Sequence, residues 1–480
     1  MTTFTHGPDI QLEFKPSHFF QPFTIKSCKT YNSTRTLENP ASQALVSLQG
    51  HDFDDKAPVE VRGKRILDVL GLHDICKVRV RDGKGKQWVD VKGMIRNISE
   101  QLTDPQGKPG RNVQISLAGI GQALVDYQIF WHPHIAARSN LGGMGYLIRS
   151  KGRPPKGRPD EVLHQLADTF FNDDYIFRLA DQTPINQAIF RNFGIITDGM
   201  AIIALSAMGM EGPLWQTLKR FSDAPWNELF VDIPHELNNP TSQALGDVPQ
   251  FSYDNIHLYL RKTPYEREDW DRLAQKGSGW GFEYREEDRM EPGEMLARNV
   301  DKVYNFFWCP AKAVFAGKDQ LAMVYNQSNG KLPIIDEDSV RKYGLRRLEQ
   351  QTEYVQIANS AAAKQGVIPA ADRVRMQTTA LKWSDLLVDR TKRIARWNGY
   401  DKFEEGTIGT RGRIGADYNH GARIGGVITR QRDGKQFYIT GIQQNWSHPG
   451  PHTTTLTVSR GHDPADYQAW WAKRLAIIGV

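Results

Sequence analysis

The chain is poor in cysteine, with only three thiols in 480 residues, at Cys28, Cys76 and Cys309. None of them forms a CxxC pair, and so odd and sparse a set is poor material for a disulfide framework or a four-ligand metal site. Cys76 alternates with apolar residues in Cys76-Lys77-Val78-Arg79-Val80, which predicts a buried thiol on a strand. We expect neither a bound metal nor a cofactor.

Long apolar runs are also missing. The longest, residues 199–210, is only about 12 residues long, too short to cross a bilayer. The start of the chain, Met1 to His6, lacks the charged segment and apolar segment of a signal peptide. A content of 39% hydrophobic and 24% charged residues is typical of a soluble protein, and the net charge of +6 is too weak to indicate nucleic-acid binding. These features predict folding in a reducing cytoplasm, without a membrane segment.

Familiar catalytic motifs are absent from the sequence as well. It contains no GxSxG, HExxH or Walker A pattern. The run Gly277 to Gly281 lacks the spacing of a phosphate-binding loop, and it favours a loop around a tryptophan. Trp131-His132-Pro133-His134 offers two imidazoles without a third ligand nearby, which favours a polar loop over a metal site. We therefore predict no catalytic, cofactor-binding or metal-binding residues, and no enzymatic activity.

Two charged clusters leave alternatives open. A dense acidic cluster could contain a glycosidase-like carboxylate pair, although such a pair must lie about 5–10 Å apart in a cleft and sequence adjacency shows nothing of the kind. Its members are Glu286, Glu287, Asp288, Glu291 and Glu294. A basic loop at 151–158 could contact phosphates or an acidic partner, although a solvated turn is favoured. The residues for such contacts are Lys151, Arg153, Lys156 and Arg158.

What the sequence does contain is one motif written twice. The first copy, 77–93, passes through Arg81-Asp82-Gly83-Lys84, and the second, 426–441, passes through Arg432-Asp433-Gly434-Lys435. In each copy an alternating apolar run precedes the Asp-Gly turn and another follows it, which predicts a hairpin because glycine tolerates the positive φ of such turns. Two related small β domains are therefore expected in one chain.

Each copy ends with a further alternating run, 111–119 in the first and 453–461 in the second. If the closing glycines Gly119 and Gly461 are aligned, the apolar positions of the two runs are out of phase by one residue. A slip of one residue exchanges the two faces of a strand. Either the spacing to the glycine differs between the copies or a bulge intervenes.

Helical spacing of apolar residues occurs between the β segments and within the second one. It predicts helices at 162–170 and at Pro213–Phe221, and later at Ser339–Tyr354, capped near Asp336, and Ala371–Trp397. The second β domain then closes between Gly406 and His462, so the later helices are best read as an insertion. The predicted fold class is α+β, mainly β.

Several stretches, in this order along the second half, resemble phage baseplate hub proteins. In the first half the resemblance rests on the β domain and its RDGK hairpin. The matching stretches are Glu228–Asp232, Tyr259–Tyr265 with Trp270, Asp336–Arg346, Arg413–Gly415 through Arg423–Ile424, Phe437–Ile442 and Thr453–Gly461.

The resemblance implies two tube-type β-barrels in each chain. The implied segments are a first barrel at 1–121, an α/β connecting domain at 122–224, the first part of a second barrel at 225–310, a helical insertion at 311–405, and closing strands with a C-terminal tail at 406–480. Type VI secretion spike proteins share this hub. No lysozyme domain and no spike repeat follow in this sequence, so the spike is expected to be a separate protein.

The function that the resemblance implies is structural. A homotrimeric ring in the virion's tail baseplate would adapt the six-fold tail tube above to the three-fold spike below, with the tape-measure protein and other baseplate proteins as further partners. DNA would pass only transiently through its channel, and assembly would take place in the host bacterial cytoplasm. Two other classes remain: a tail-associated peptidoglycan hydrolase using the acidic 286–294 cluster, and a DNA-binding module using the basic loop 151–158.

Overall fold

The structure is a computed structural model of the chain, and it is described for part of the sequence. The described residues are 9–17, 22–26, 28–49, 62–81, 87–103, 110–129, 156–171, 179, 183, 185–195, 202–203, 212–233, 256–275, 278–285, 289–313, 331–350, 352–356, 385–411 and 422–478.

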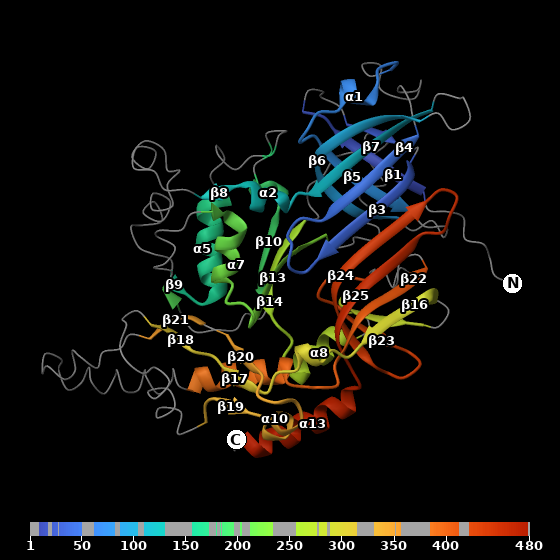
Figure 1. Cartoon of the computed structure of the whole chain (residues 1–480). Coiled ribbons are helices and arrows are strands. Elements are labelled where there is room, and N and C mark those ends of the chain that lie inside the picture. The colour runs from blue at the N-terminus through green and yellow to red at the C-terminus, as the bar shows by residue number, and fades with distance from the viewer. Residues whose placement is uncertain are drawn as a thin grey trace, which may run out of the picture.

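The N-terminal part forms seven antiparallel strands (Figure 1). They are β1 (Asp9–Lys15), β2 (Phe23–Ile25), β3 (Cys28–Thr36), β4 (Gln43–Gln49), β5 (Ile75–Arg81), β6 (Gln87–Thr103) and β7 (Gly110–Gly119). The predicted alternation is confirmed, since Cys76, Val78 and Val80 are all fully buried while their neighbours on β5 point to the other face. Strands β5 and β6 pair as the first RDGK hairpin predicts, although residues 82–86 of its turn lie outside the described residues.

The C-terminal half contributes six strands to the same sheet. They are β15 (Gly281–Tyr284), β16 (Arg289–Ala297), β22 (Glu404–Arg411), β23 (Val427–Arg430), β24 (Gln436–Ser447) and β25 (Thr453–His462). The second RDGK hairpin is confirmed: β23 and β24 pair antiparallel, and Gly434 in their turn has a φ of 69°. The second β unit is therefore built from separated stretches of chain; of the stretch predicted at 225–310, β15 and β16 belong to it, whereas the strands at 227–232 and 257–262 belong to a separate sheet.

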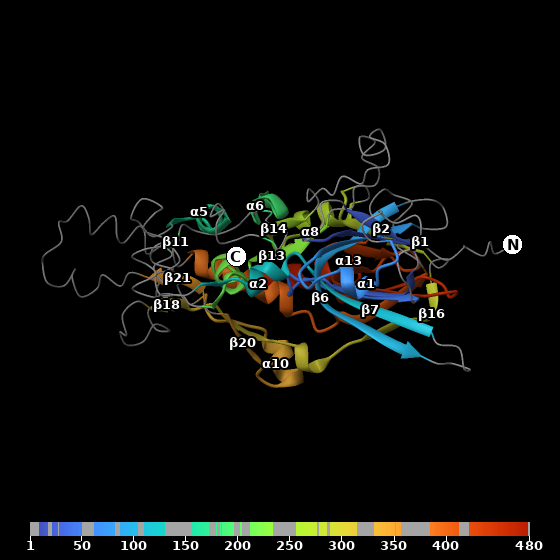
Figure 2. The same cartoon turned by 90° about the horizontal axis from the view of Figure 1, so that it is seen from above.

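The two β units are joined edge to edge. Strand β24 pairs antiparallel with β3, from Gly441 opposite Thr36 to Ser447 opposite Thr30, and Figure 1 shows the two strands side by side. The result is a 13-stranded sheet with the order β16-β22-β25-β24-β3-β4-β7-β6-β5-β1-β2, and with β23 and β15 attached to β24. Viewed from above, β6 and β7 extend beyond the neighbouring strands (Figure 2). Among the described strands, no pairing links β16 to β2.

A bulge explains why the two copies of the motif are out of phase. Strand β25 carries one extra residue between Ser459 and His462 relative to β24, and the same excess appears relative to β22. Strand β7 pairs with β4 without a shift over the corresponding stretch. Burial on β25 accordingly switches face, from Leu456 and Val458 to Gly461. Of the two explanations for the mismatch, the bulge is the one observed.

A smaller α/β region lies beside the sheet, on the left in Figure 1. Its core packs helices against the three-stranded sheet β10-β14-β13, and the predicted helices at 162–170 and 213–221 are confirmed by α5 and α7. Its helices are α2 (Gln122–Asp126), α5 (Pro159–Phe171), α6 (Ile185–Ala188) and α7 (Leu214–Phe221). Its strands are β8 (Gln128–Ile129), β9 (Lys156–Gly157), β10 (Phe190–Ile195), β11 (Ile202–Ile203), β12 (Gly212–Pro213), β13 (Asn227–Asp232) and β14 (His257–Lys262).

The region at the bottom of Figure 1 corrects one helix prediction. Helix α10 begins after Asp336, whose side chain accepts a hydrogen bond from the backbone N of Ser339 at 3.0 Å, but it ends at Tyr343 and does not reach Tyr354. Gly344 follows with a φ of 75°, a conformation that stops a helix. The chain then continues as strands. Of the helix predicted over 371–397, the described part is helical at 385–398.

The remaining elements complete this lower region. They are α8 (Arg267–Ala274), the 3₁₀ helix η4 (Val300–Lys302), β17 (Phe306–Trp308), β18 (Ala311–Ala313), β19 (Ile334–Ile335), α10 (Glu337–Tyr343), β20 (Arg347–Glu349), β21 (Thr352–Gln356) and α13 (Pro464–Ile478). Helix α1 (Ile66–Val69) lies at the opposite end of the molecule. The segment 311–405, predicted as a helical insertion, thus contains short strands as well. No helix in the described part of the chain is long and apolar enough to span a membrane.

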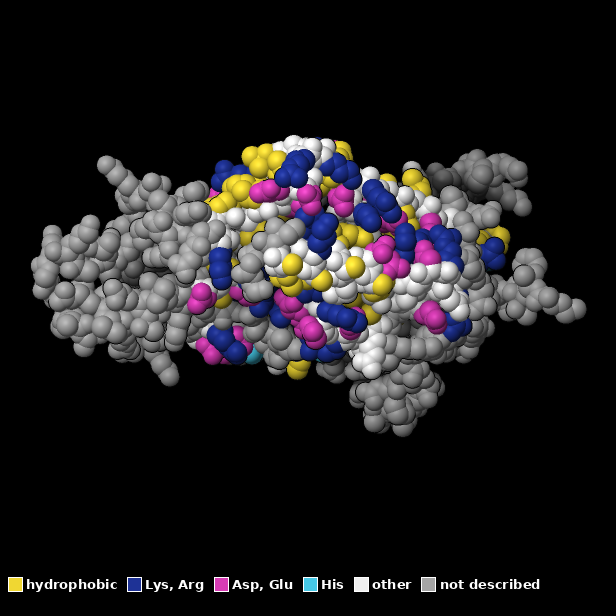
Figure 3. Space-filling view, turned by 90° about the horizontal axis from the view of Figure 1, so that it is seen from below, with side chains coloured by type: hydrophobic (Ala, Val, Ile, Leu, Met, Phe, Trp, Pro, Cys, Tyr) yellow, Lys and Arg dark blue, Asp and Glu magenta, His cyan; other side chains and the backbone are white. Residues whose placement is uncertain are grey.

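The face of the molecule seen from below mixes charges of both signs. Lys and Arg side chains lie beside Asp and Glu side chains over the described part of this face, with hydrophobic side chains scattered among them (Figure 3). The lower region contains ion pairs that bring such charges together, including Lys342 with Asp401 at 3.1 Å and Arg474 with Asp336 at 2.9 Å. This mixture agrees with the weak net charge of +6.

Candidate functional site

The basic loop is only partly described. Lys151 and Arg153 lie outside the described residues, and Lys156 belongs to the short strand β9. Arg158 is exposed, and its Nη2 lies 2.8 Å from Oδ2 of Asp160. This neighbouring carboxylate occupies the one guanidinium of the loop whose contacts are described. Contact of the loop with phosphate or with an acidic partner stays a prediction.

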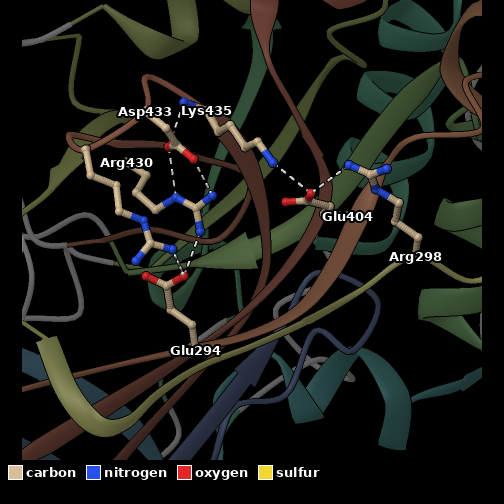
Figure 4. A network of polar contacts seen from close by, with 7 residues as sticks. Glu294, Arg298, Glu404, Arg430, Asp433 and Lys435 are labelled. Atoms are coloured by element: carbon tan, nitrogen blue, oxygen red, sulfur yellow. Dashed lines mark hydrogen bonds and ion pairs between the residues drawn. The ribbon is translucent and has the colours of Figure 1, made fainter.

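The acidic cluster contains one carboxylate whose surroundings are described, Glu294 on β16. Its Oε2 lies 2.6 Å from Nη1 of Arg430, as Figure 4 shows, and 2.8 Å from Nη2 of Arg432. Glu286, Glu287 and Asp288 lie outside the described residues, as does the side chain of Glu291. Both arginines bind Oε2 of Glu294, so this oxygen is occupied by ion pairs within the protein.

The same corner of the sheet holds a second set of ion pairs. Glu404 on β22 accepts hydrogen bonds from Lys435 at 2.7 Å and from Arg298 at 3.1 Å. Burial opposes ionisation of Glu404, but these two hydrogen bonds outweigh it and lower the pKa of its carboxyl. Asp433, in the RDGK turn, binds Arg430 through both oxygens. These ion pairs connect the edge strand β16 and the hairpin turn to the rest of the sheet.

A buried polar cluster lies at the joint between the two β units. Asp90 on β6 is fully buried and accepts hydrogen bonds from Arg35 Nη2 at 3.1 Å and from Gln444 Nε2 at 2.8 Å. The hydroxyl groups of Tyr31 and Ser33 also donate to this carboxylate. Because Gln444 belongs to β24 while the other groups belong to the N-terminal strands, the cluster ties the two β units together.

The joint extends to the three-stranded sheet. Nη1 of Arg35 lies 3.5 Å from Oδ1 of Asp232 at the end of β13, and Oδ2 of Asp232 lies 3.0 Å from Nε of Arg423. Arg423 also donates to the hydroxyl of Tyr259 and stacks on Trp280, with its Cζ 4.0 Å from the ring centroid. Two arginines and two carboxylates thus compensate one another in the interior.

A second buried set links β13 and β14 to β24. Nη2 of Arg261 on β14 lies 3.0 Å from Oε2 of Glu228 and 2.9 Å from the hydroxyl of Tyr438. The same nitrogen donates to the backbone oxygen of Gly425, where an added Cβ would lie 2.3 Å from it. Burial, together with the charge of Glu228, raises the pKa of Tyr438. The phenol therefore stays protonated and acts as a donor to Glu228.

A groove lies between the second β unit and the lower region. Its volume is about 1280 Å³, and its walls include residues of β16, of the segment 297–304 and of 397–407. Within the described residues, no group of three or more His, Cys, Asp and Glu residues could hold a metal ion. The histidine pair 132/134 lies outside the described residues.

Sequence reasoning missed these joints. Arg35, Asp90 and Asp232 sit on strands where a charged residue normally indicates an exposed face, and their partners are 55 or more residues away. The sequence offered one signal for their burial, the alternation along β3. Ser33 and Arg35 lie on the buried face of this strand, and Asn32 and Thr34 lie on the other face.

No protein-family model matches the sequence, and no curated protein matches it. Solved structures do match. The 43 kDa tail protein of prophage MuSo2 from Shewanella oneidensis is 13% identical, with a TM-score of 0.48 over 94% of this chain and 98% of its own. The tail protein from Neisseria meningitidis MC58 is 12% identical, with a TM-score of 0.47 over 95% and 97%. An E. coli component of the type VI secretion system is 7% identical, with a TM-score of 0.38 over 94% and 77%. The chain is thus similar, along more than nine tenths of its length, to solved tail and secretion-system proteins.

Proposed function

We propose that this chain is a structural hub of a phage tail baseplate. In this proposal, three copies form a ring that adapts a six-fold tail tube to a three-fold spike and surrounds part of the DNA channel. The neighbours are the tail tube protein on one side and a separate spike protein on the other, with the tape-measure protein and other baseplate proteins as further partners. The assembled location is the virion.

One observation carries the proposal: the two β units of the chain share one sheet. The β24–β3 pairing runs without a register shift from Gly441 to Ser447. Below it, the buried Asp90 cluster and the Arg35–Asp232–Arg423 chain fix the angle between the units. A ring needs neighbouring units held at a constant angle, and a registered sheet with a buried polar joint holds them so.

The two edge strands of the shared sheet are the surfaces through which neighbouring chains of the ring would meet. Strand β16 pairs only with β22, and β2 only with β1, among the described strands. Chains related by rotation meet through different surfaces at their two ends, and such a contact closes into a ring when the rotation divides a full turn. Two β units in each of three chains would then give six around the axis.

The proposed division of the chain follows the same logic. A first tube-type barrel at 1–121 and a second at 225–310 and 406–480 would be the ring-forming units. The connecting domain at 122–224 and the insertion at 311–405 would form the flanks that meet other baseplate proteins. This role requires no catalysis. The ion pairs of Glu294 with Arg430 and Arg432 disfavour the alternative of a peptidoglycan hydrolase.

The oligomeric state tests the proposal directly. Native mass spectrometry of the purified chain should give three times the 54.5 kDa chain mass, and images of the particle should show a ring with six lobes. A stable monomer that also fails to bind its neighbouring tail proteins would contradict the hub role. A zymogram on peptidoglycan tests the alternative of a hydrolase. A hydrolase would clear the peptidoglycan, and the clearing would be lost when Glu287 or Glu294 is replaced.

A pair of substitutions locates the contact. Met295 on the edge strand β16 is 71% exposed, and Leu345, between α10 and β20, is 66% exposed. Met295→Glu should shift the trimer towards monomer without changing the free energy of unfolding of the chain, because a charge would enter the contact at the edge of the sheet. Leu345→Glu serves as the matched control and should leave the trimer intact. Equal behaviour of the two variants would rule out β16 as the contact.

A further inference from the structure

An aromatic pocket lies where α8, the helix at 385–398, the end of β25 and the start of α13 meet. Its volume is about 350 Å³, within the usual size of a small-ligand site. The rings that line it contact one another: Trp270 and Trp397 have centroids 6.1 Å apart, and Tyr265 lies 5.2 Å from Trp397. The imidazole of His462 lies 5.0 Å from Trp270.

The charges around this pocket do not cancel. Arg396 pairs with Glu266 at 2.6 Å, and Arg267 pairs with Asp271 at 3.1 Å. Burial lowers the pKa of His462 to about 4, so its ring is neutral at neutral pH. The remaining charged group in the lining is Arg460. One positive charge is therefore in excess.

Arg460 is held firmly by neutral groups. Its Nε donates to the backbone oxygen of Trp397 at 3.2 Å, and its two Nη atoms donate to Ser459 and Asn398. Its Cζ lies 4.0 Å from the centroid of the Trp397 ring. No carboxylate pairs with it in the part of the chain that the structure describes. Burial lowers the pKa of this guanidinium.

The bulge in β25 is what brings Arg460 to this position. The extra residue of the strand falls at 459–461, and Arg460 has a φ of 54°, a conformation that costs a non-glycine residue free energy. Bulges redirect side chains and are enriched beside functional sites. In the first copy β7 carries no extra residue relative to β4 or to β6, so the bulge in the closing strand belongs to the second copy alone.

These contacts indicate the chemistry of a ligand that Arg460 can bind. A guanidinium has five N–H groups, and the three acceptors above leave one on each Nη atom, the number that a carboxylate accepts in a bidentate pair. The surrounding rings favour an apolar group attached to that carboxylate. A free acid and the C-terminal residue of a partner protein both carry this chemistry.

We propose that the pocket binds a carboxylate attached to an apolar group, with Arg460 as its anchor. The inference goes beyond the hub role and does not depend on it, because binding can be measured on any oligomer of the chain.

Calorimetric titration with N-acetyl-L-phenylalanine, which keeps a free carboxylate, tests the proposal on the unmodified chain. It should bind, and N-acetyl-L-phenylalaninamide, which differs only in that group, should bind at least tenfold more weakly. Equal binding of the two, or binding of neither, would overturn the proposal. A hexapeptide ending in phenylalanine separates the sources: tighter binding than the single residue indicates a protein terminus, and equal binding indicates a free acid.

Two substitutions of Arg460 test whether this residue binds the carboxylate. Arg460→Gln should weaken binding of the carboxylate probe at least tenfold, whereas Arg460→Lys should retain part of it because the charge stays. The matched control is Arg346→Gln, since Arg346 also donates to backbone oxygens, those of Val300 and Tyr343, but lies outside the pocket. Circular dichroism checks the fold of each variant. If Arg460→Gln fails to fold, the comparison of acid and amide on the unmodified chain still decides. Unchanged binding in a folded Arg460→Gln would contradict the assignment.

Discussion

Nη2 of Arg35 lies 3.1 Å from Oδ1 of Asp90, and both side chains are removed from solvent. Arg35 belongs to β3, which borders the second β unit, whereas Asp90 belongs to β6 of the first unit. Four donors meet at this carboxylate, and one of them, Gln444, comes from the other β unit. The ion pair therefore lies at the joint on which the proposed ring depends.

Asp90→Ala should lower the free energy of unfolding by roughly 3–5 kcal/mol, because it leaves a buried guanidinium and several donors without their acceptor. Urea unfolding followed by tryptophan fluorescence measures the change. The control is Asp68→Ala, whose partner Arg65 lies 2.9 Å away in an exposed pair. That change should lower the free energy of unfolding far less than Asp90→Ala, because solvent screens an exposed ion pair. Equal effects of the two substitutions would show that the buried cluster adds no stability.

Gly406→Ala should destabilise the second β unit. Gly406 has a φ of 147°, and an added Cβ would lie 1.9 Å from the backbone oxygen of Met295 on the neighbouring strand. Gly434→Ala is the matched control, since its φ of 69° is also strained but its Cβ would meet nothing within 4 Å. We expect a loss of about 1–2 kcal/mol for Gly434→Ala from conformation alone, and a clearly larger one for Gly406→Ala. The opposite order would refute the close approach of β16 to β22.

Stability should fall with acidification through Glu404. Its pKa is lowered in the folded protein from an ordinary value of 4.5, so folding favours the ionised form. The stabilisation is fully present above pH 4.5 and is lost as the pH falls through the lower, folded-state value. Thermal unfolding between about pH 7 and pH 3 should show a steeper decline in the unmodified chain than in Glu404→Gln. Parallel curves over this range would contradict the prediction.

The thiols should be slow to react in the folded chain. Burial raises the pKa of Cys28 to about 12 and that of Cys309 to about 12, and it raises the pKa of Cys76 as well. Thiolate, the reactive form, is therefore scarce at about pH 8. Labelling with a disulfide reagent should proceed slowly in native buffer and reach all three thiols in denaturant. Rapid labelling of the native chain would show that these strands open readily.

The local parts of this fold could be predicted from the sequence, because a strand of period two and an Asp-Gly turn reveal themselves within about ten residues. The hairpin at 432–435 and helices α5 and α7 are of this kind. Helix α10 was predicted too long, since Val340, Tyr343 and Leu348 keep a helical spacing across Gly344, whose positive φ ends the helix. The buried ion pairs could not be predicted, since a strand pattern says which residues share a face but not which distant carboxylate will meet them. The Arg460 pocket was missed for the same reason, although the phase mismatch at Gly119 and Gly461 marked its position.

The pairing of β24 with β3 also sets the order in which the chain can fold. Asn32 on β3 bonds to Asn445 on β24, a partner 413 residues later in the sequence. During synthesis the N-terminal strands emerge long before that partner exists, and the edge of β3 stays open meanwhile. Two nascent chains on one messenger could satisfy that edge by exchanging β24, and the product would be a linked pair instead of a self-contained subunit. The edge of β3 must therefore remain unpaired until residues 436–447, which form β24, have been synthesised.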